Sequence, residues 1–234
     1  MLDVIAFDAD DTLWHNEHVY RDTQSRIISI LAQYHDAEWI ERRMYETEIR
    51  NIEHYGYGFK GFTLSMIETA IELTDGCISG AEIGQILELT REMVKAPVVL
   101  LDGVQETIAE LSAHHDLMLI TKGDLFEQEA KIIRSGLAEY FSKIEIVRTK
   151  TPEAYQSLTA KHRLTPERFL MIGNSLKSDI LPVIAIGGRA VYIPYETTWA
   201  HEVVPENELI GKDFFRLSHI RELPALIENL RKTN

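Results

Sequence analysis

The sequence has one cysteine, few clustered positive charges and no long apolar run. Its single cysteine, Cys77, excludes a disulfide within the chain and fits a reducing compartment. No stretch is long and apolar enough to span a bilayer, and the opening residues lack a basic region followed by an apolar segment. We therefore expect a cytoplasmic protein with no membrane partner.

Positive charge is scarce. The formal net charge is −13, and basic residues cluster no further than in pairs such as Arg42-Arg43. Binding to a nucleic-acid backbone needs a positive footprint, so we expect no nucleic-acid partner. The overall charge also opposes anionic substrates, so any phosphate site must be made locally positive by a metal ion, a lysine or helix N-termini. No spacing of histidine and cysteine indicates a zinc site.

The first part of the chain predicts one strand followed by helices. The 234 residues, 45% hydrophobic, suit one compact unit or a core with a smaller companion. Residues 4–7 are an apolar run of strand length, whereas helical spacing dominates from about residue 20 to 92. A loop rich in glycine and aromatic residues is predicted at 54–62, inside this helical region. We interpret the region as a helical bundle inserted after the first strand.

The rest of the chain alternates between strand-like and helix-like segments. Apolar runs lie at residues 117–120, 144–147, 169–172 and 191–193, and helical segments at 125–135, 152–162, 180–186 and 223–230. Such alternation predicts right-handed crossovers and a parallel sheet covered on both faces. We therefore predict an α/β fold, with a core formed by residues 1–15 and 97–234 and a helical domain formed by residues 16–96.

Polar side chains follow four of the predicted strands. Ligands of open parallel sheets bind beyond the carboxyl ends of the strands, so these residues are candidates for one shared site. Singly, each has a structural explanation, as a helix N-cap, a solvated lysine or a turn residue. The candidates, in strand order, are Asp8 and Asp10, Thr121 and Lys122, Lys150, and Asn174 and Asp179.

Phosphoryl transfer is the chemistry that this set can perform. The Asp8 carboxylate can attack phosphorus to form an aspartyl-phosphate, and Asp10 can protonate the leaving oxygen and later accept a proton from water. Mg²⁺ between Asp8, Asp179 and the phosphate would cancel the repulsion between carboxylate and phosphate. Thr121 and the backbone N–H groups near Lys122 can hold phosphate oxygens, and Lys150 can neutralise both the phosphate and Asp8.

At these residues the chain resembles the haloacid dehalogenase (HAD) superfamily of phosphohydrolases. The four motifs of that superfamily are matched, in order, by residues 8–12, Thr121, Lys150 and residues 173–179. The resemblance implies a Rossmann-like core and a mobile C1-type helical cap. It also implies Mg²⁺ held by Asp8, the backbone carbonyl of Asp10, and Asp179.

Two positions refine the resemblance. Many relatives have aspartate where this chain has Asn174, which keeps an oxygen but lacks the charge. We interpret Asn174 as contacting the metal through water or orienting Asp179. Relatives that dehalogenate carbon usually lack the second aspartate of the first motif, so Asp10 favours phosphate over haloacid.

The inserted helices contribute weaker candidates. In relatives with such caps a cap loop closes over the substrate, so Tyr57 and Lys60 are candidate contacts with the leaving group. Packing of the aromatic residues within the insertion is the alternative. His15 and His18 follow the first motif, and we expect hinge or surface roles for them.

We therefore predict a Mg²⁺-dependent phosphatase of a small phosphorylated metabolite. Three alternatives stay open: a phosphomutase that shields the aspartyl-phosphate from water, a 2-haloacid dehalogenase, and a regulatory or scaffold protein that has kept the site. Nucleotide monophosphates, sugar phosphates and phosphoglycolate all fit the pattern as substrates, and the oligomeric state is open.

Overall fold

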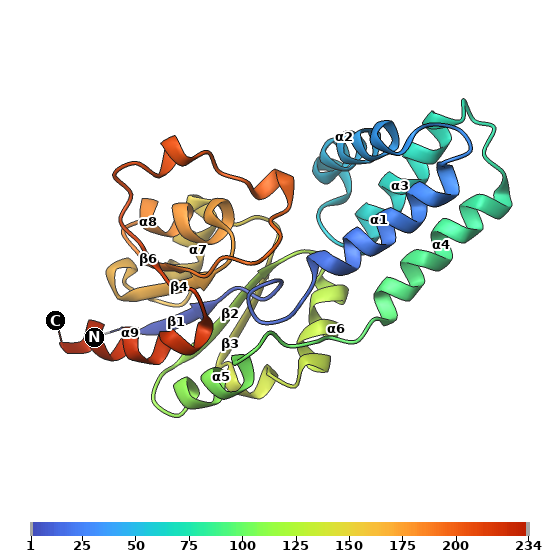
Figure 1. Ribbon diagram of the computed structural model, residues 1–234. Helices are drawn as coiled ribbons and strands as arrows, with labels where there is room; N and C mark the ends of the chain where they lie inside the picture. Colours follow the sequence, from blue (N-terminus) through green and yellow to red (C-terminus); the bar gives the residue numbers. More distant parts are fainter. Residues whose placement is uncertain (1, 233–234) are drawn as a thin grey trace. The chain divides into compact units, whose positions relative to one another are not determined.

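The computed structural model describes residues 2–232, and the chain divides into two compact units (Figure 1). The core unit contains the chain up to His15, residues 98–122 and the chain from Gln128 onward. The helical unit contains residues 16–97 together with residues 123–127. Within the described part of the chain, no helix has the length and apolar character needed to cross a membrane.

The main elements, in chain order, are β1 (Val4–Phe7), α1 (Glu17–Leu31), α2 (Ala37–Tyr55), α3 (Phe59–Leu73), α4 (Gly80–Lys95), α5 (Val104–Ser112), β2 (Leu117–Lys122), α6 (Leu125–Ser135), β3 (Lys143–Val147), α7 (Pro152–Lys161), β4 (Phe169–Gly173), η3 (Leu176–Ile180), α8 (Leu181–Ala185), β5 (Arg189–Tyr192), η4 (Ala200–Glu202), β6 (Phe215–Arg216) and α9 (Leu223–Lys232).

A six-stranded parallel sheet organises the core unit, in the order β3-β2-β1-β4-β5-β6. The central strand β1 pairs with β2 on one side and β4 on the other, and Ile5 stands opposite Leu117 and Leu170. The predicted α/β fold, with helices inserted after the first strand, is confirmed. The two-residue strand β6 was not predicted, because so short a segment carries no periodic pattern.

Alternate residues of β1 face opposite sides of the sheet. Ile5 and Phe7 pack in a cluster that includes residues of α5, α6 and α9, whereas Val4 and Ala6 pack with residues of α7 and α8. All four side chains are buried, as expected for a strand at the centre of a sheet covered on both faces. The carboxyl ends of β1, β2 and β4 consequently lie along one edge of the sheet.

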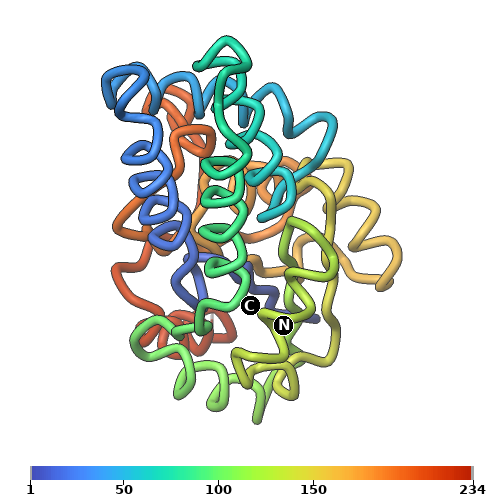
Figure 2. The backbone as a smooth tube through the Cα atoms, turned by 90° about the vertical axis from the view of Figure 1, so that its right-hand side faces the viewer, coloured from blue at the N-terminus to red at the C-terminus, as the bar shows by residue number. Residues whose placement is uncertain are grey.

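The helical unit has a hydrophobic core of its own. Figure 2 shows α1 and α4 running side by side, and α2 packs along α3. Each of the four helices contributes buried apolar side chains, among them Ile27, Met44, Met66 and Ile86. Helix α4 begins with a capping box in which the Ser79 hydroxyl and the Glu82 side chain satisfy backbone N–H groups.

The glycine-rich stretch breaks the helices over a shorter span than predicted. Helix α2 continues to Tyr55 and α3 begins at Phe59, so only residues 56–58 form the connection. Gly56 and Gly58 have φ of 73° and 113°, a region that glycine enters without steric cost. Gly61 lies inside α3, where a Cβ would clash with the carbonyl oxygen of Gly56. Density of glycine was therefore a poor guide to loop length here.

A carboxyl group on α2 makes the stability of the protein pH-dependent. Burial raises the pKa of Glu48 to about 7, and its Oε2 has no hydrogen-bond partner among the described residues. The folded chain thus holds a proton that the unfolded chain releases near the ordinary glutamate pKa. The stabilising contribution is complete below that value and is lost as the pH rises through 7.

Glu48→Gln is therefore expected to gain stability relative to the parent as the pH rises. Between pH 4.5 and pH 8 the difference in unfolding free energy should move in favour of the variant by roughly 3 kcal/mol. Urea unfolding at the two pH values measures this change, with the exposed neighbour Glu53→Gln as control. A difference that is the same at both pH values would contradict the assignment.

Candidate active site

The chain turns sharply as it leaves β1. Asp11 adopts the left-handed conformation, with φ of 59°, which aspartate tolerates better than most residues. The N–H groups of Thr12 and Leu13 both donate to the carbonyl of Ala9, closing the turn. The turn carries the Thr12 side chain back toward the end of the strand that it has just left.

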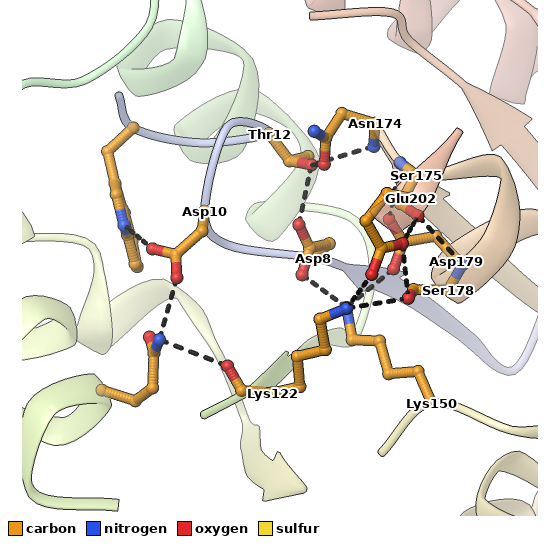
Figure 3. Close-up of polar contacts among 12 residues, drawn as sticks. Asp8, Asp10, Thr12, Lys122, Lys150, Asn174, Ser175, Ser178, Asp179 and Glu202 are labelled. Atoms are coloured by element: carbon orange, nitrogen blue, oxygen red, sulfur yellow. Dashed lines mark hydrogen bonds and ion pairs between the residues drawn. The ribbon is translucent and has the colours of Figure 1, made fainter. Parts of the chain in front are cut away.

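Two buried carboxylates meet at one ammonium group. Asp8 ends β1 and Asp179 lies in the segment after β4, and the Lys150 ammonium forms an ion pair with both, at 2.7 Å from Asp179 Oδ1 and in very short contact with Asp8 Oδ1 (Figure 3). Lys150 directly precedes the N-cap of α7, Thr151, and Pro152 occupies the first helical turn. Three segments far apart in the sequence thus converge at the predicted sheet edge.

The charges of this cluster do not balance. Burial lowers the pKa of Lys150, but the charges of Asp179 and Asp8 outweigh that effect, so its pKa lies above the ordinary lysine value. Burial, together with the negative charge of Asp8, raises the pKa of Asp179 to about 7 against the opposing effect of Lys150. One ammonium cannot fully compensate two enclosed carboxylates.

The turn after β4 is shaped to hold Asp179. Ser175 precedes the π-helical turn η3, and its backbone N–H donates to Asp179 Oδ2 at 3.0 Å. Gly173 has no Cβ, and a Cβ there would overlap the Asp179 carboxyl group. Helix α8 follows with Pro182 in its first turn, where a missing backbone N–H costs little.

Asn174 is tied to the turn after β1. The Thr12 hydroxyl lies 3.0 Å from Asp8 Oδ2 and 3.1 Å from Asn174 Oδ1, and it accepts the Asn174 N–H at 3.1 Å. Its one proton can serve only one of the two oxygens at a time. None of the described hydrogen bonds of Asp179 comes from Asn174, so Thr12 is its link to the cluster.

Asp10 points away from Asp8 into a separate polar cage (Figure 3). Lys131 Nζ donates to both of its oxygens at 2.7 and 2.8 Å, Gln128 Nε2 donates at 2.8 Å and Trp14 Nε1 at 2.7 Å. Burial opposes ionisation, but the charge and hydrogen bond of Lys131, with those of Gln128 and Trp14, hold the pKa of Asp10 below its ordinary value. Sequence reasoning missed Lys131 and Gln128, whose only signal was their spacing on one face of α6.

Thr121 and Lys122 lie where predicted, at the carboxyl end of β2, and Thr121 is buried. The Lys122 ammonium donates to Ser178 Oγ at 3.0 Å and forms a very short ion pair with Glu202. Glu202 also accepts hydrogen bonds from the Ser175 and Ser178 hydroxyls. Sequence reasoning gave no role to this residue, which follows β5 in a segment without periodic pattern.

The candidates from the insertion lie in the helical unit. Tyr57 is in the three-residue connection before α3, and Lys60 is in the first turn of α3. Lys60 pairs with Asp124, which belongs to the same unit, at 2.9 Å. His15 Nδ1 lies 2.7 Å from the Tyr195 hydroxyl within the core unit. Contact of Tyr57 and Lys60 with a leaving group stays a prediction.

The donor set of the site fits a divalent cation. Asp8 and Asp179 supply carboxylate oxygens with excess negative charge, and the amide oxygen of Asn174 is joined to Asp8 through Thr12. Oxygen ligands of this kind suit Mg²⁺, which keeps part of its water shell in proteins. No cluster of three His, Cys, Asp or Glu side chains occurs among the described residues, so protein ligands beyond the two carboxylates would be neutral oxygens.

Comparison with known proteins identifies relatives over nearly the whole chain. The sequence model described as haloacid dehalogenase-like hydrolase matches residues 2–187. The crystal structure of a haloacid dehalogenase-like family hydrolase from Xanthomonas campestris is 40% identical, with a TM-score of 0.86, and the match covers 98% of this chain and 91% of that one.

More distant relatives differ in the activity that their names give. A glyceraldehyde 3-phosphate phosphatase of Pyrococcus furiosus is 24% identical over 99% of this chain and 94% of its own length. A 2-haloacid dehalogenase of Pseudomonas syringae pv. Tomato DC3000 has 19% identity and a TM-score of 0.63, with 98% of this chain and 100% of that one covered. Similarity at this level shows a shared fold.

Proposed function

The chain belongs to the haloacid dehalogenase-like hydrolases, and from that premise we propose that it is a Mg²⁺-dependent phosphatase of small phosphorylated metabolites. The observation that carries the proposal is the meeting of Asp8 and Asp179 at the Lys150 ammonium. A carboxylate nucleophile needs strong positive charge beside it before it can approach an anionic phosphate, whereas a carbon–halogen centre needs far less. The named phosphatase relative supports the same class of substrate.

Mg²⁺, when bound, supplies charge neutralisation for the phosphate oxygens and the nucleophile. Asp8, Asp179 and the Asp10 backbone carbonyl would hold it, with Asn174 contributing through a water molecule. Lys150 supplies a second positive charge from the protein itself, fixed by α7 and by its two carboxylate partners.

The first step forms an aspartyl-phosphate. An Asp8 oxygen attacks phosphorus while the bond between phosphorus and the ester oxygen breaks. A proton from Asp10 passes to the departing alcohol oxygen, which leaves Asp10 as a carboxylate. Lys150, Thr121 and the backbone N–H groups near Lys122 hold the equatorial oxygens.

The second step releases phosphate. Asp10, now ionised, takes a proton from a water molecule as that water attacks phosphorus. The bond between phosphorus and Asp8 breaks, inorganic phosphate leaves, and Asp10 is protonated again. The cage of Lys131, Gln128 and Trp14 favours the ionised form of Asp10, which this second step uses, and disfavours the protonated form that the first step uses.

A panel of phosphorylated metabolites and 2-haloacids, assayed with Mg²⁺ and with EDTA, tests the proposal. We expect Mg²⁺-dependent release of inorganic phosphate from at least one phosphate monoester and no halide release. Halide release without phosphate release would identify a dehalogenase. Conversion of a sugar phosphate to its isomer without phosphate release would identify a phosphomutase.

Lys131→Met is expected to make the reaction more sensitive to acid. In the parent, the charge of Lys131 counteracts the rise in the Asp10 pKa that burial causes. Without this charge the pKa of Asp10 rises, and less of the carboxylate is available to accept the proton from water. The ratio of kcat at pH 5 to kcat at pH 7 should fall by roughly fivefold or more.

Lys143→Met, which removes a lysine at the edge strand β3 with a 3.7 Å pairing to Asp116, is the matched control. It should keep the parent pH profile. A Lys131→Met profile that is scaled down evenly at every pH would show that Lys131 serves folding or placement of Asp10 without setting its ionisation.

A further inference from the structure

Glu202 anchors a buried polar network beside the candidate site. Its Oε1 forms the ion pair with Lys122, and its Oε2 accepts from the Ser175 hydroxyl and, at 2.8 Å, from the Ser178 hydroxyl. Only 11% of the Glu202 side chain and 20% of the Lys122 side chain are exposed. A carboxylate with this many donors holds its partners firmly.

The network joins the ends of β2 and β4 to the η4 segment of the core unit. Lys122 directly follows Thr121 at the end of β2, and Ser175 and Ser178 flank the turn that carries Asp179. Figure 3 shows Glu202 next to Ser175, Ser178 and the end of Lys122, on the Asp179 side of the site. A second contact, from Lys177 Nζ to the His201 carbonyl at 2.7 Å, ties the η4 segment to the same turn.

The pairing changes what Lys122 can do. An ammonium at the end of β2 would otherwise be a ready partner for an anionic group on the substrate. Glu202 already pairs with this ammonium. Burial alone would raise the pKa of Glu202, but the positive charge of Lys122 and the two serine hydroxyl donors outweigh that effect and lower the pKa to about 2. At neutral pH the pair is therefore uncharged overall, and an incoming anion would have to displace a buried carboxylate.

We propose that Glu202 is a specificity-determining residue that keeps Lys122 from serving as a second anion site, so that the enzyme selects phosphate monoesters of uncharged alcohols over those that carry a carboxylate beside the ester. This inference rests on the proposed phosphatase function. Lys150, which would hold the phosphate itself, pairs with Asp8 and Asp179, whereas the ion pair of Glu202 is with Lys122. A second negative group on the substrate would meet Glu202 instead of a free ammonium, and like charges repel.

A matched pair of substrates isolates this effect. 2-Phosphoglycolate and 2-hydroxyethyl phosphate have the same chain length and differ in a carboxylate against a hydroxymethyl group. We expect the parent to prefer 2-hydroxyethyl phosphate by about tenfold or more in kcat/KM, on the scale of one charged hydrogen bond. Where turnover of either compound is too slow, its competitive inhibition constant against the best panel substrate gives the same comparison.

Glu202→Gln should reduce that preference by about tenfold, because it keeps the acceptor for the serine hydroxyls but removes the negative charge that neutralises Lys122. Adding Lys122→Met to Glu202→Gln should restore discrimination against 2-phosphoglycolate. Glu208→Gln, an exposed substitution in the same segment after β5, should leave both constants at the parent values.

Two results would overturn the inference while leaving the phosphatase proposal standing. One is an equal kcat/KM of the parent enzyme for the two compounds, a result that requires no variant. The other is a Glu202→Gln enzyme that loses both substrates in equal proportion, which would make Glu202 a purely structural anchor. Absence of phosphatase activity across the whole panel would instead overturn the proposed function, and this inference with it.

Discussion

Asp8→Asn is expected to abolish phosphate release, with a loss in kcat of at least about 10³-fold, on the scale seen when an enzyme loses its nucleophile. The asparagine amide has nearly the same size but cannot form the aspartyl-phosphate. Asp8 is buried, and its two oxygens contact Lys150 and Thr12, so the substitution fits the space and changes mainly the charge. Phosphate release from the best panel substrate, with Mg²⁺ present, measures the loss.

The stability of the same variant separates chemistry from folding. Removing one of two carboxylates that share an ammonium relieves their mutual repulsion, so we expect Asp8→Asn to unfold at the same urea concentration as the parent or a higher one. Asp116→Asn, an exposed substitution at the opposite end of β2, is the control and should keep full activity. Near-parent activity of Asp8→Asn would remove Asp8 from the role of nucleophile.

Lys150→Met is expected to cause the largest loss of stability. It leaves Asp8 and Asp179 buried without their shared cation, and removing one partner from a buried ion pair typically costs about 3–5 kcal/mol. That amount is a large share of the total stability of a typical domain. Urea unfolding at pH 8 measures the loss, and activity should disappear as well, because the phosphate loses its positive partner.

The pH dependence of this loss can be derived from Asp179. Its pKa in the folded parent is already raised to about 7, and removal of Lys150 raises it further. A raised carboxyl pKa means that stability is complete at low pH and is lost as the pH rises, so the gap between variant and parent should be wide at pH 8 and narrow at pH 5. Added Mg²⁺ should narrow the gap at pH 8.

Lys161→Met, on the same helix α7, is the matched control for Lys150→Met. Lys161 pairs with Glu145, but 62% of its side chain is exposed, and exposed ion pairs contribute at most about 1 kcal/mol. Equal losses for the two variants would show that the position of Lys150 between two buried carboxylates has no special effect on stability.

Much of the fold follows from local patterns in the sequence. The apolar runs at residues 4–7, 117–120 and 169–172 are central strands, because a central parallel strand must be apolar on both faces, and the run at 144–147 lies in the edge strand β3. The helices from α6 to α9 likewise follow from the spacing of apolar residues between those strands. Where local signal was weak or misleading, as at β6 and at Gly61, the prediction failed.

The candidate site was predictable only where it depends on strand ends. Asp8, Lys150 and Asp179 come together because parallel strands place their carboxyl ends at one edge, which is a rule of topology that the residue order already implies. Lys131, Gln128 and Glu202 could not be found in this way. Lys131 and Gln128 contact Asp10, and Glu202 contacts Lys122. The partners in these contacts lie up to 121 positions apart in the sequence.

The amino-acid order by itself determined the sheet, its helical insertion and the polar residues that close each strand, since burial and periodicity act on neighbours along the chain. Only the tertiary structure decided the remaining ionic partners: Asp179 as the second carboxylate at Lys150, Lys131 for Asp10 and Glu202 for Lys122. The physical reason is that a buried charge is tolerated only beside an opposite one, and that partner is chosen by distance in space after the chain has folded.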